Sequence, residues 1–393
     1  EEGERRLGGP EQSDWAARLD EEHPNLRAAL TWALQAGAGD PVLAARLAGA
    51  LWRFWFRRGY LSEGSWWLQQ ALAATGDAPV PIRAKLLTAE GSIARMQNES
   101  VRASTLLEAG AALYRELDDA EGLAWALSHL GMVKQWLGFL DEGVELLEES
   151  LTMRRSLGDQ PDITRSLFNL AAAEDFRRNY ARAAELYEET LAAQRRVGDT
   201  WGMGRALSHL GKVALVQGDE ERAAALCQEG LGLSREVGDN WGVGLALAGL
   251  GGVAAYRGDA ERAAALLKKS LVAFRDVGSR DRIAECLQEL ATLVGAQGRA
   301  KEATRLSAAA EATQEGSGLA LFPAVRARRD QDLAVARATL GEAAFAQAWS
   351  EGLAMSRNQA IDYALAVADL DSDTTTGPKR SSTGAATSPR ARC

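Results

Sequence analysis

The chain of 393 residues has few side chains of the kinds that build cross-links or metal centres. It contains three cysteines and three histidines, and no two cysteines have the Cys-x-x-Cys spacing. This scarcity argues against a disulfide framework and against a structural zinc site. We therefore expect no metal and no other cofactor. Cys227, Cys286 and Cys393 are predicted to be buried thiols in a reducing cytoplasm.

Long hydrophobic runs and an excess of positive charge are also missing. No stretch approaches the roughly 18 consecutive apolar residues of a membrane-spanning helix, and no export signal opens the chain. The formal net charge is −9, which would repel nucleic acid and acidic membrane surfaces. No phosphate loop of the form G-x-x-x-x-G-K-[ST] is present, so ATPase activity cannot be assigned. These absences predict a soluble, cytoplasmic protein.

What the sequence has in abundance is Ala, Leu, Glu and Arg, a mixture typical of helices. A short turn recurs within it at a constant spacing of 40 residues. The turn is Leu157-Gly158-Asp159, then Val197-Gly198-Asp199, Val237-Gly238-Asp239 and Val277-Gly278-Ser279. Leucine recurs in the same frame at Leu130, Leu170, Leu210, Leu250 and Leu290. Such a period indicates a repeat architecture.

Each 40-residue unit has the pattern of two helices. Met203, Leu207 and Leu210 follow helical spacing, Gly218-Asp219 interrupts it, and Leu226 resumes it. Glycine tolerates the left-handed conformation that ends a helix, and the aspartate that follows can accept hydrogen bonds from the next helix. Two such helices cannot bury their apolar faces alone, so neighbouring units must stack.

The repeat frame predicts an all-α fold, a right-handed α-solenoid of about seven helix pairs over residues 41–315. Residues 1–40 are predicted to form a helical N-terminal cap or junction, and residues 316–367 to form helices that cap the other end. Residues 368–393 contain almost no apolar side chains, so burial cannot offset their ordering entropy. We expect this tail to be disordered.

Two parts of the sequence, the repeat units and the N-terminal segments, each resemble a known family. The units, most clearly Ala206–Ala214 followed by Gly218–Ala223, resemble the tetratricopeptide repeats (TPRs) of bacterial signalling proteins. The segments 9–32, with Glu22-His23-Pro24-Asn25-Leu26, and 51–68 resemble the junction and first repeat of STAND-type signalling ATPases, which include LuxR-like transcriptional regulators. The resemblance implies a sensor arm, with residues 1–40 joining it to a missing upstream ATPase module. No LuxR-type helix-turn-helix follows the repeats.

In the resembled family the first helix of each unit lines a concave groove that binds a partner. Residues of the first helices that do not point into the core are therefore predicted to contact a protein or peptide. Polar and apolar members of this set are Ser128, His129, Met132, Trp136, Phe168, Asn169, Ser208 and His209. Its basic members are Arg46, Arg53, Arg57, Lys85, Arg95, Arg165, Arg205 and Lys212. Glu285 and Glu289 occupy equivalent positions near the far end, which predicts a charge-polarised groove.

Several functional interpretations stay open at this point. The basic stripe suits an acidic or phosphorylated partner, because guanidinium groups bind carboxylate and phosphate bidentately. Alternatively, these side chains only pair with carboxylates of adjoining helices, and the groove residues are simply solvated. The sequence favours a non-enzymatic interaction scaffold that acts as the sensor domain of a regulator. A free-standing adaptor is the alternative, and nucleic-acid binding, which would weaken steeply with salt, is a third.

Overall fold

The structure is a computed structural model that describes residues 1–6, 12–35, 39–76, 79–158, 160–314 and 323–367. Within these ranges the chain forms helices and no strand. The predicted tail, Cys393 included, lies outside them. The helices are α1 Glu2–Arg6, α2 Gln12–Ala33, α3 Pro41–Arg58, α4 Leu61–Ala74, α5 Val80–Met96, α6 Ser100–Glu116, α7 Ala120–Trp136, α8 Leu140–Leu157, α9 Gln160–Phe176, α10 Tyr180–Val197, α11 Thr200–Val216, α12 Glu220–Glu236, α13 Asn240–Tyr256, α14 Ala260–Asp276, α15 Arg280–Ala296, α16 Ala300–Gln314, α17 Pro323–Leu340, α18 Glu342–Leu353 and α19 Arg357–Val367.

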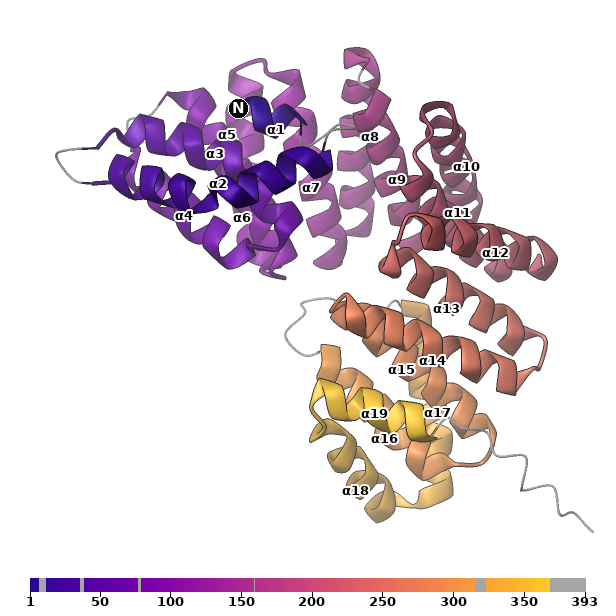
Figure 1. Cartoon of the computed structure of the whole chain (residues 1–393). Helices are drawn as coiled ribbons and strands as arrows, with labels where there is room; N and C mark the ends of the chain where they lie inside the picture. The colour runs from indigo at the N-terminus through magenta and orange to yellow at the C-terminus, as the bar shows by residue number, and fades with distance from the viewer. Residues whose placement is uncertain (7–11, 36–38, 77–78, 159, 315–322, 368–393) are drawn as a thin grey trace, which may run out of the picture.

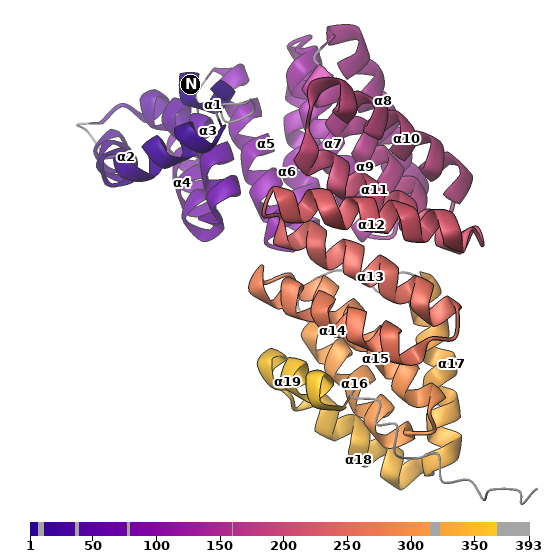
Figure 2. The ribbon, with the colours of Figure 1, turned by 45° about the vertical axis from the view of Figure 1, so that its right-hand side comes forward.

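Helices α3 to α16 form seven consecutive pairs that stack into a curved solenoid (Figure 1). The first helices α7, α9, α11, α13 and α15 begin 40 residues apart, at Ala120, Gln160, Thr200, Asn240 and Arg280. Each helix packs against the next one in the chain, both within a pair and between pairs. Figure 2 shows the same stack from another side, with α8 to α12 joining its two ends. The predicted α-solenoid of seven helix pairs is confirmed.

The turns between helices work as the sequence predicted. Gly198 and Gly218 adopt φ values of 69° and 87°, in the left-handed region that favours glycine. The Asp199 carboxylate then accepts a hydrogen bond of 2.9 Å from the backbone amide of Gly202, and Asp219 caps α12 in the same way. Asp239 is an exception, because it forms no such cap and its carboxylate is used elsewhere. At Gly198-Asp199 and Gly218-Asp219 the turn thus ends one helix and starts the next within a few residues.

Small residues allow the two helices of a pair to approach closely. A Cβ atom on Gly131 of α7 would lie 2.7 Å from the carbonyl oxygen of Gly143 in α8, which is too close for any side chain. In the pair α11 and α12, a Cβ atom on Gly211 would lie 2.5 Å from the sulfur of Cys227. Cys227 and Cys286 are buried free thiols, as predicted. Close helix contact thus requires glycine at these positions.

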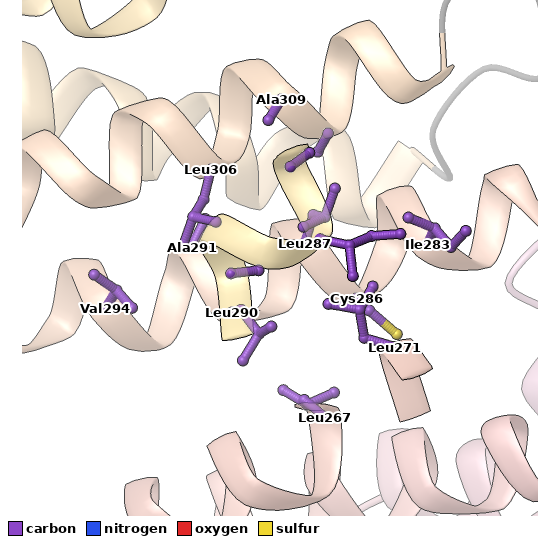
Figure 3. Packing of buried hydrophobic residues seen from close by; sticks show 14 of the residues in the cluster. Leu267, Leu271, Ile283, Cys286, Leu287, Leu290, Ala291, Val294, Leu306 and Ala309 are labelled. Carbon is purple, nitrogen blue, oxygen red and sulfur yellow. The ribbon is translucent and has the colours of Figure 1, made fainter. Parts of the chain in front are cut away.

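The C-terminal helices cover the last pair. Ile361 of α19 is fully buried, in one apolar cluster with Leu287 of α15 and Leu306 of α16. Figure 3 shows this packing, with Leu267 and Leu271 reaching into it from α14. Helix α18 contacts α16 as well. The apolar end of the repeat stack is thereby shielded from water.

At the other end, α2 packs on the first helix pair. The ring of His23 stacks on Tyr60, with ring centroids 4.7 Å apart, and its Nε2 lies 3.0 Å from Glu63 Oε1. Arg27 Nε donates to the same Glu63 oxygen at 2.7 Å, and this contact holds the pKa of Glu63 below its usual value. Helix α2 is thus linked to α4 by polar contacts.

Candidate ligand-binding groove

The first helices of the pairs line the inner side of the curve. From α3 to α13 each first helix contacts the next first helix, as α3 does α5 and as α11 does α13, whereas neighbouring second helices contact one another little or not at all. The curvature is strong enough for Trp52 of α3 to stack on Trp125 of α7, past α5, with ring centroids 4.7 Å apart. We call this inner surface the groove. Several of the predicted partner-binding residues, among them Trp136, Phe168 and Asn169, are half-buried on these first helices.

His129 lies at the centre of the N-terminal half of the groove. Its ring contacts the edges of Trp52 and Trp125, with centroid distances of 6.3 and 6.4 Å. Burial is the main cause that holds the pKa of His129 well below its usual value. The nearby guanidinium groups of Arg95 and Arg165 lower this pKa further. His129 is therefore neutral at pH 7, and its buried Nδ1 has no hydrogen-bond partner among the described residues.

A similar arrangement recurs around His209 in the next part of the groove. The ring of His209 stacks on Tyr187 at a centroid distance of 5.4 Å and meets Phe168 edge-on at the same distance. Burial again holds the pKa of His209 well below its usual value. The aromatic contact continues through Trp241 to Phe274. The ring contacts thus run from the first helices into the core, because Tyr187 and Phe274 are fully buried on second helices.

Most of the predicted basic groove residues have carboxylate partners. Arg205 donates to both oxygens of Asp239, at 2.7 and 3.0 Å, and its guanidinium lies 3.6 Å from the ring centroid of Trp201. The other pairs are Arg46 with Glu1, Lys85 with Glu4, Arg165 with Asp162 and Lys212 with Asp175. Arg165 pairs within its own helix α9, whereas the other four basic side chains pair with carboxylates from other parts of the fold. For those four, the arrangement is that of the alternative in which basic side chains satisfy carboxylates of neighbouring segments.

Two basic residues differ from that pattern. Arg95 is only 8% exposed, forms no ion pair with a described residue, and lies over the Trp136 ring at 5.3 Å from the centroid. Burial lowers its pKa to about 10. Arg53 is half-buried beside Trp52 and likewise has no ion pair within the described ranges. The side chain of Arg57 lies outside the described residues.

The uncharged residues predicted to contact a partner differ in how deeply they are buried. Asn169 is half-buried, and its Nδ2 donates to Ser128 Oγ at 3.3 Å, which links α9 to α7. Met132 is half-buried against the apolar cluster around Leu170. Ser208 corrects the prediction: it is 1% exposed, and its hydroxyl donates to the Gly204 carbonyl at 2.9 Å. It lies inside the α11–α12 contact and offers nothing to a partner.

A pocket of about 240 Å³ opens in the N-terminal part of the groove. Six helices, α1, α3, α5, α6, α7 and α8, contribute to its lining. The lining residues are Glu4, Trp52, Arg53, Lys85, Tyr114, Asp119, Glu121, Gly122, Trp125 and Arg154. The repeat register assigned second helices to the outer face, so it missed Tyr114 and Arg154, which reach inward from the ends of α6 and α8. Both are long side chains near the end of a second helix, and such side chains can extend past neighbouring residues. This feature of the sequence could have identified Tyr114 and Arg154.

The far end of the groove is more balanced in charge than predicted. Glu285 pairs with Arg282 at 2.7 Å, and Glu289 lies 3.7 Å from Arg328 of α17. Among the described residues, no three or more His, Cys, Asp or Glu side chains gather as a metal site would require. None of the described helices has the length and apolar character needed to cross a bilayer. The groove is thus a surface of aromatic rings, amides and charged groups.

Comparisons with known proteins support this architecture. Residues 122–196 match the family model described as tetratricopeptide repeat. No curated protein matches the chain by sequence. Helices α7 to α10 thus carry TPR helix pairs, and the following structural matches share the helical repeat fold.

Three solved structures are similar to the chain at low sequence identity. The apo form of RapI has a TM-score of 0.57 at 14% identity, covering 68% of this chain and 98% of RapI. The Rap conjugation gene regulator of plasmid pLS20, solved with the Phr* peptide, has a TM-score of 0.57 at 14% identity, covering 79% and 86%. The apo quorum sensor NprR from B. thuringiensis has a TM-score of 0.55 at 12% identity, covering 80% and 97%.

Proposed function

We propose that this chain is a peptide- or protein-binding repeat domain that holds its partner along the groove. The observation that carries the proposal is the inner surface itself, where Trp136, Phe168 and Asn169 are half-buried on successive first helices. Half-exposed aromatic and amide side chains on a rigid, preformed surface are typical of peptide recognition. The structure solved with the Phr* peptide has a similar fold, which supports a peptide as the partner.

We further propose that binding is regulatory, as in the sensor arm of a cytoplasmic signalling ATPase or transcriptional regulator. The contacts of His23 and Arg27 with Glu63 support this idea, because they couple α2 to the first helix pair. A partner that changes the curvature of the repeats would thereby move α2, shifting the population of an attached module. The chain itself would perform no catalysis.

The free-standing adaptor remains the second candidate. The coding sequence upstream of the codon for Glu1 separates the two. A reading frame that continues into a phosphate loop of the form G-x-x-x-x-G-K-[ST] supports the regulator. A start codon directly before this segment would favour the adaptor.

Peptide binding can be tested by phage display with random peptides on the purified chain. Recovered peptides are labelled, and their Kd is measured by fluorescence anisotropy. The variant Trp136→Ala with Asn169→Ala should bind at least about tenfold more weakly, because it removes two groove contacts. The matched control is Glu145→Ala with Glu148→Ala, two exposed residues of α8 on the outer face. Failure to enrich any peptide, or equal loss in both variants, would contradict the proposal.

A further inference from the structure

The N-terminal segment, residues 1–6, lies against the inner side of the first helix pairs. Its helix α1 contacts α3, and Figure 2 shows the two side by side. Glu4 accepts a hydrogen bond of 3.2 Å from Trp52 Nε1 of α3 and one of 2.6 Å from Lys85 Nζ of α5. Trp52 stacks on Trp125 at this same end of the groove. One glutamate of the segment thus joins two first helices where the groove begins.

The segment contacts residues that were predicted to contact a partner. Glu1 accepts hydrogen bonds from Arg46 Nε and Nη2, at 3.1 and 2.8 Å. Arg46 and Lys85 both belong to the predicted partner-binding set, and each pairs with a carboxylate of this segment. Glu4 also lines the pocket of about 240 Å³, together with residues of α6, α7 and α8. The segment therefore covers one end of the surface that we assign to a partner.

Helix α1 is held by polar contacts rather than by a core. Its residues, Glu2–Arg6, include no apolar side chain, whereas the apolar cluster at this end of the stack is built mainly from α2, α3, α4 and α5. A helix of five residues is unstable on its own. The side chains of Glu1 and Arg46 are more than half exposed, and ion pairs of this kind contribute little to stability. A segment attached in this way can leave the groove at a small cost in free energy, and the helix pairs keep their core.

We propose that residues 1–6 are an internal ligand of the groove, which closes its N-terminal end until a partner displaces them. The inference rests on the proposed function for the partner, whereas the docking of the segment is a contact within the chain. A partner that covers Trp52 and Lys85 competes with Glu4 for the same donors. Only molecules whose segment is undocked can accept it, so its apparent Kd rises by the inverse of that fraction. Displacement also separates α1 from α3, so the position of the segment depends on the partner.

The docking of the segment can be tested without a partner. The chain is labelled with ¹⁵N-tryptophan, and the Nε1–H signal of Trp52 is assigned from the variant Trp52→Phe. Glu1→Lys with Glu4→Lys, which we call the open variant, replaces both carboxylates by cations that the basic residues of α3 and α5 repel. The Trp52 signal should therefore move.

A peptide added in trans separates an internal ligand from a structural element. The acetylated peptide with the sequence of residues 1–6, in the millimolar range, should return the Trp52 signal of the open variant towards its wild-type position. It should leave the wild-type chain unchanged, because the tethered segment has the higher effective concentration. The matched control, called the α8 control, is Glu145→Lys with Glu148→Lys, the same change of charge on exposed residues of α8. Its Trp52 signal should stay in place.

The internal ligand is overturned if the Trp52 signal keeps its wild-type position in the open variant, or moves equally in the α8 control. It is also overturned if the peptide does not restore the signal, or if a peptide with lysine in place of Glu1 and Glu4 restores it equally well. An open variant that no longer folds, as judged by circular dichroism, would show that the segment is a structural element and would refute the proposal too.

Competition with a partner is tested on the open variant. Peptides are selected against it from a random phage library, and those that move its Trp52 signal are kept. Because the wild-type segment competes with them, they should bind the wild type at least about threefold more weakly, as measured by fluorescence anisotropy. The α8 control should bind them as the wild type does, since its segment stays docked.

The outcomes separate the two proposals. Equal affinity for the open variant and the wild type would refute the competition, and equal affinity for the open variant and the α8 control would attribute the effect to net charge and refute it as well. If peptides bind but none moves the Trp52 signal, the groove function stands and the closure of its N-terminal end is refuted. If no peptide binds, the proposed function fails, whereas recovery of the Trp52 signal with the peptide of residues 1–6 still supports the internal ligand.

Discussion

At the residue scale, the same side chain has different consequences along the groove. Arg205 is held between Trp201 and Trp241 and paired with Asp239, so its charge is already used. Arg95 is stacked on an aromatic ring as well, but no carboxylate compensates for it. Exposure and pairing, rather than residue type, therefore determine which basic residues are available to a partner.

The buried charge of Arg95, which no described carboxylate compensates, predicts that its removal stabilises the folded chain. Arg95→Met keeps the length of the side chain and removes the buried cation, so the free energy of unfolding should rise by about 1–2 kcal/mol. Urea denaturation followed by circular dichroism measures it. Arg222→Gln on the outer face should change stability by less than about 0.5 kcal/mol. A loss of stability in Arg95→Met would mean that stacking on Trp136 is what retains the arginine.

The two buried histidines predict a pH dependence of stability. Because the pKa values of His129 and His209 lie well below 6.5 in the folded chain, the unfolded chain binds more protons below that pH. Their contribution to stability is therefore present above pH 6.5 and is lost as pH falls towards the folded pKa values. Each histidine should contribute a slope approaching about 1.4 kcal/mol per pH unit. The free energy of unfolding is measured between pH 7 and 5.5 for the wild type and for the double variant His129→Gln with His209→Gln. If it changes with pH equally in both proteins, the buried histidines are not the cause.

The sequence predicted the groove-lining helices but not the state of each side chain. Periodicity placed His129, Asn169 and Arg165 on first helices, because position in a repeat determines the face of a helix. It could not show that Asp162 neutralises Arg165, since both lie near the start of α9 and only the rotamers bring them together. It also could not place Ser208 in the core, because a serine is compatible with either face.

At the element scale, the helix boundaries were predictable because each has a local cause. Gly198, Gly218 and Gly238 terminate helices through a left-handed conformation that a sequence pattern reveals directly. Where glycine is missing the turn persists, as at Arg178, whose φ is 63°. The repeated stack imposes that conformation on a residue that disfavours it. Less predictable was the depth of burial, since Leu226 of α12 is only half-buried while Cys227 beside it is fully buried.

Two helical glycines predict effects of opposite sign for the same substitution. Gly131→Ala places a Cβ 2.7 Å from the Gly143 carbonyl, so α7 and α8 must move apart, at a cost of about 1–3 kcal/mol. Gly232→Ala in α12 meets nothing within 4 Å and should gain about 0.5–1 kcal/mol, because alanine favours helix. Thermal or urea unfolding of the two variants measures both. Equal effects would show that helix spacing in the pair is not set by Gly131.

At the scale of the whole molecule, the fold is built from neighbour contacts. Each helix pair packs against the pair before and the pair after it, and the two ends of the stack do not touch (Figure 1). Stability in such an array is close to a sum of local terms. Local unfolding can then differ in free energy between the two ends. The groove spans many helix pairs, so a partner bound along it would contact several of them at once.

This organisation predicts that damage stays local. Ile361→Ala removes a fully buried side chain from the cluster with Leu287 and Leu306, at a cost of about 2–4 kcal/mol. Hydrogen exchange followed by mass spectrometry should show faster exchange in α14 to α19, whereas α3 to α6 should exchange as in the wild type, because no contact carries the loss that far. Leu30→Ala, which removes a buried leucine of α2, should give the reverse pattern. If either variant accelerated exchange uniformly, the chain would unfold as one cooperative unit. A partner bound at one end could then act on the other through global stability, with no need for a change in curvature.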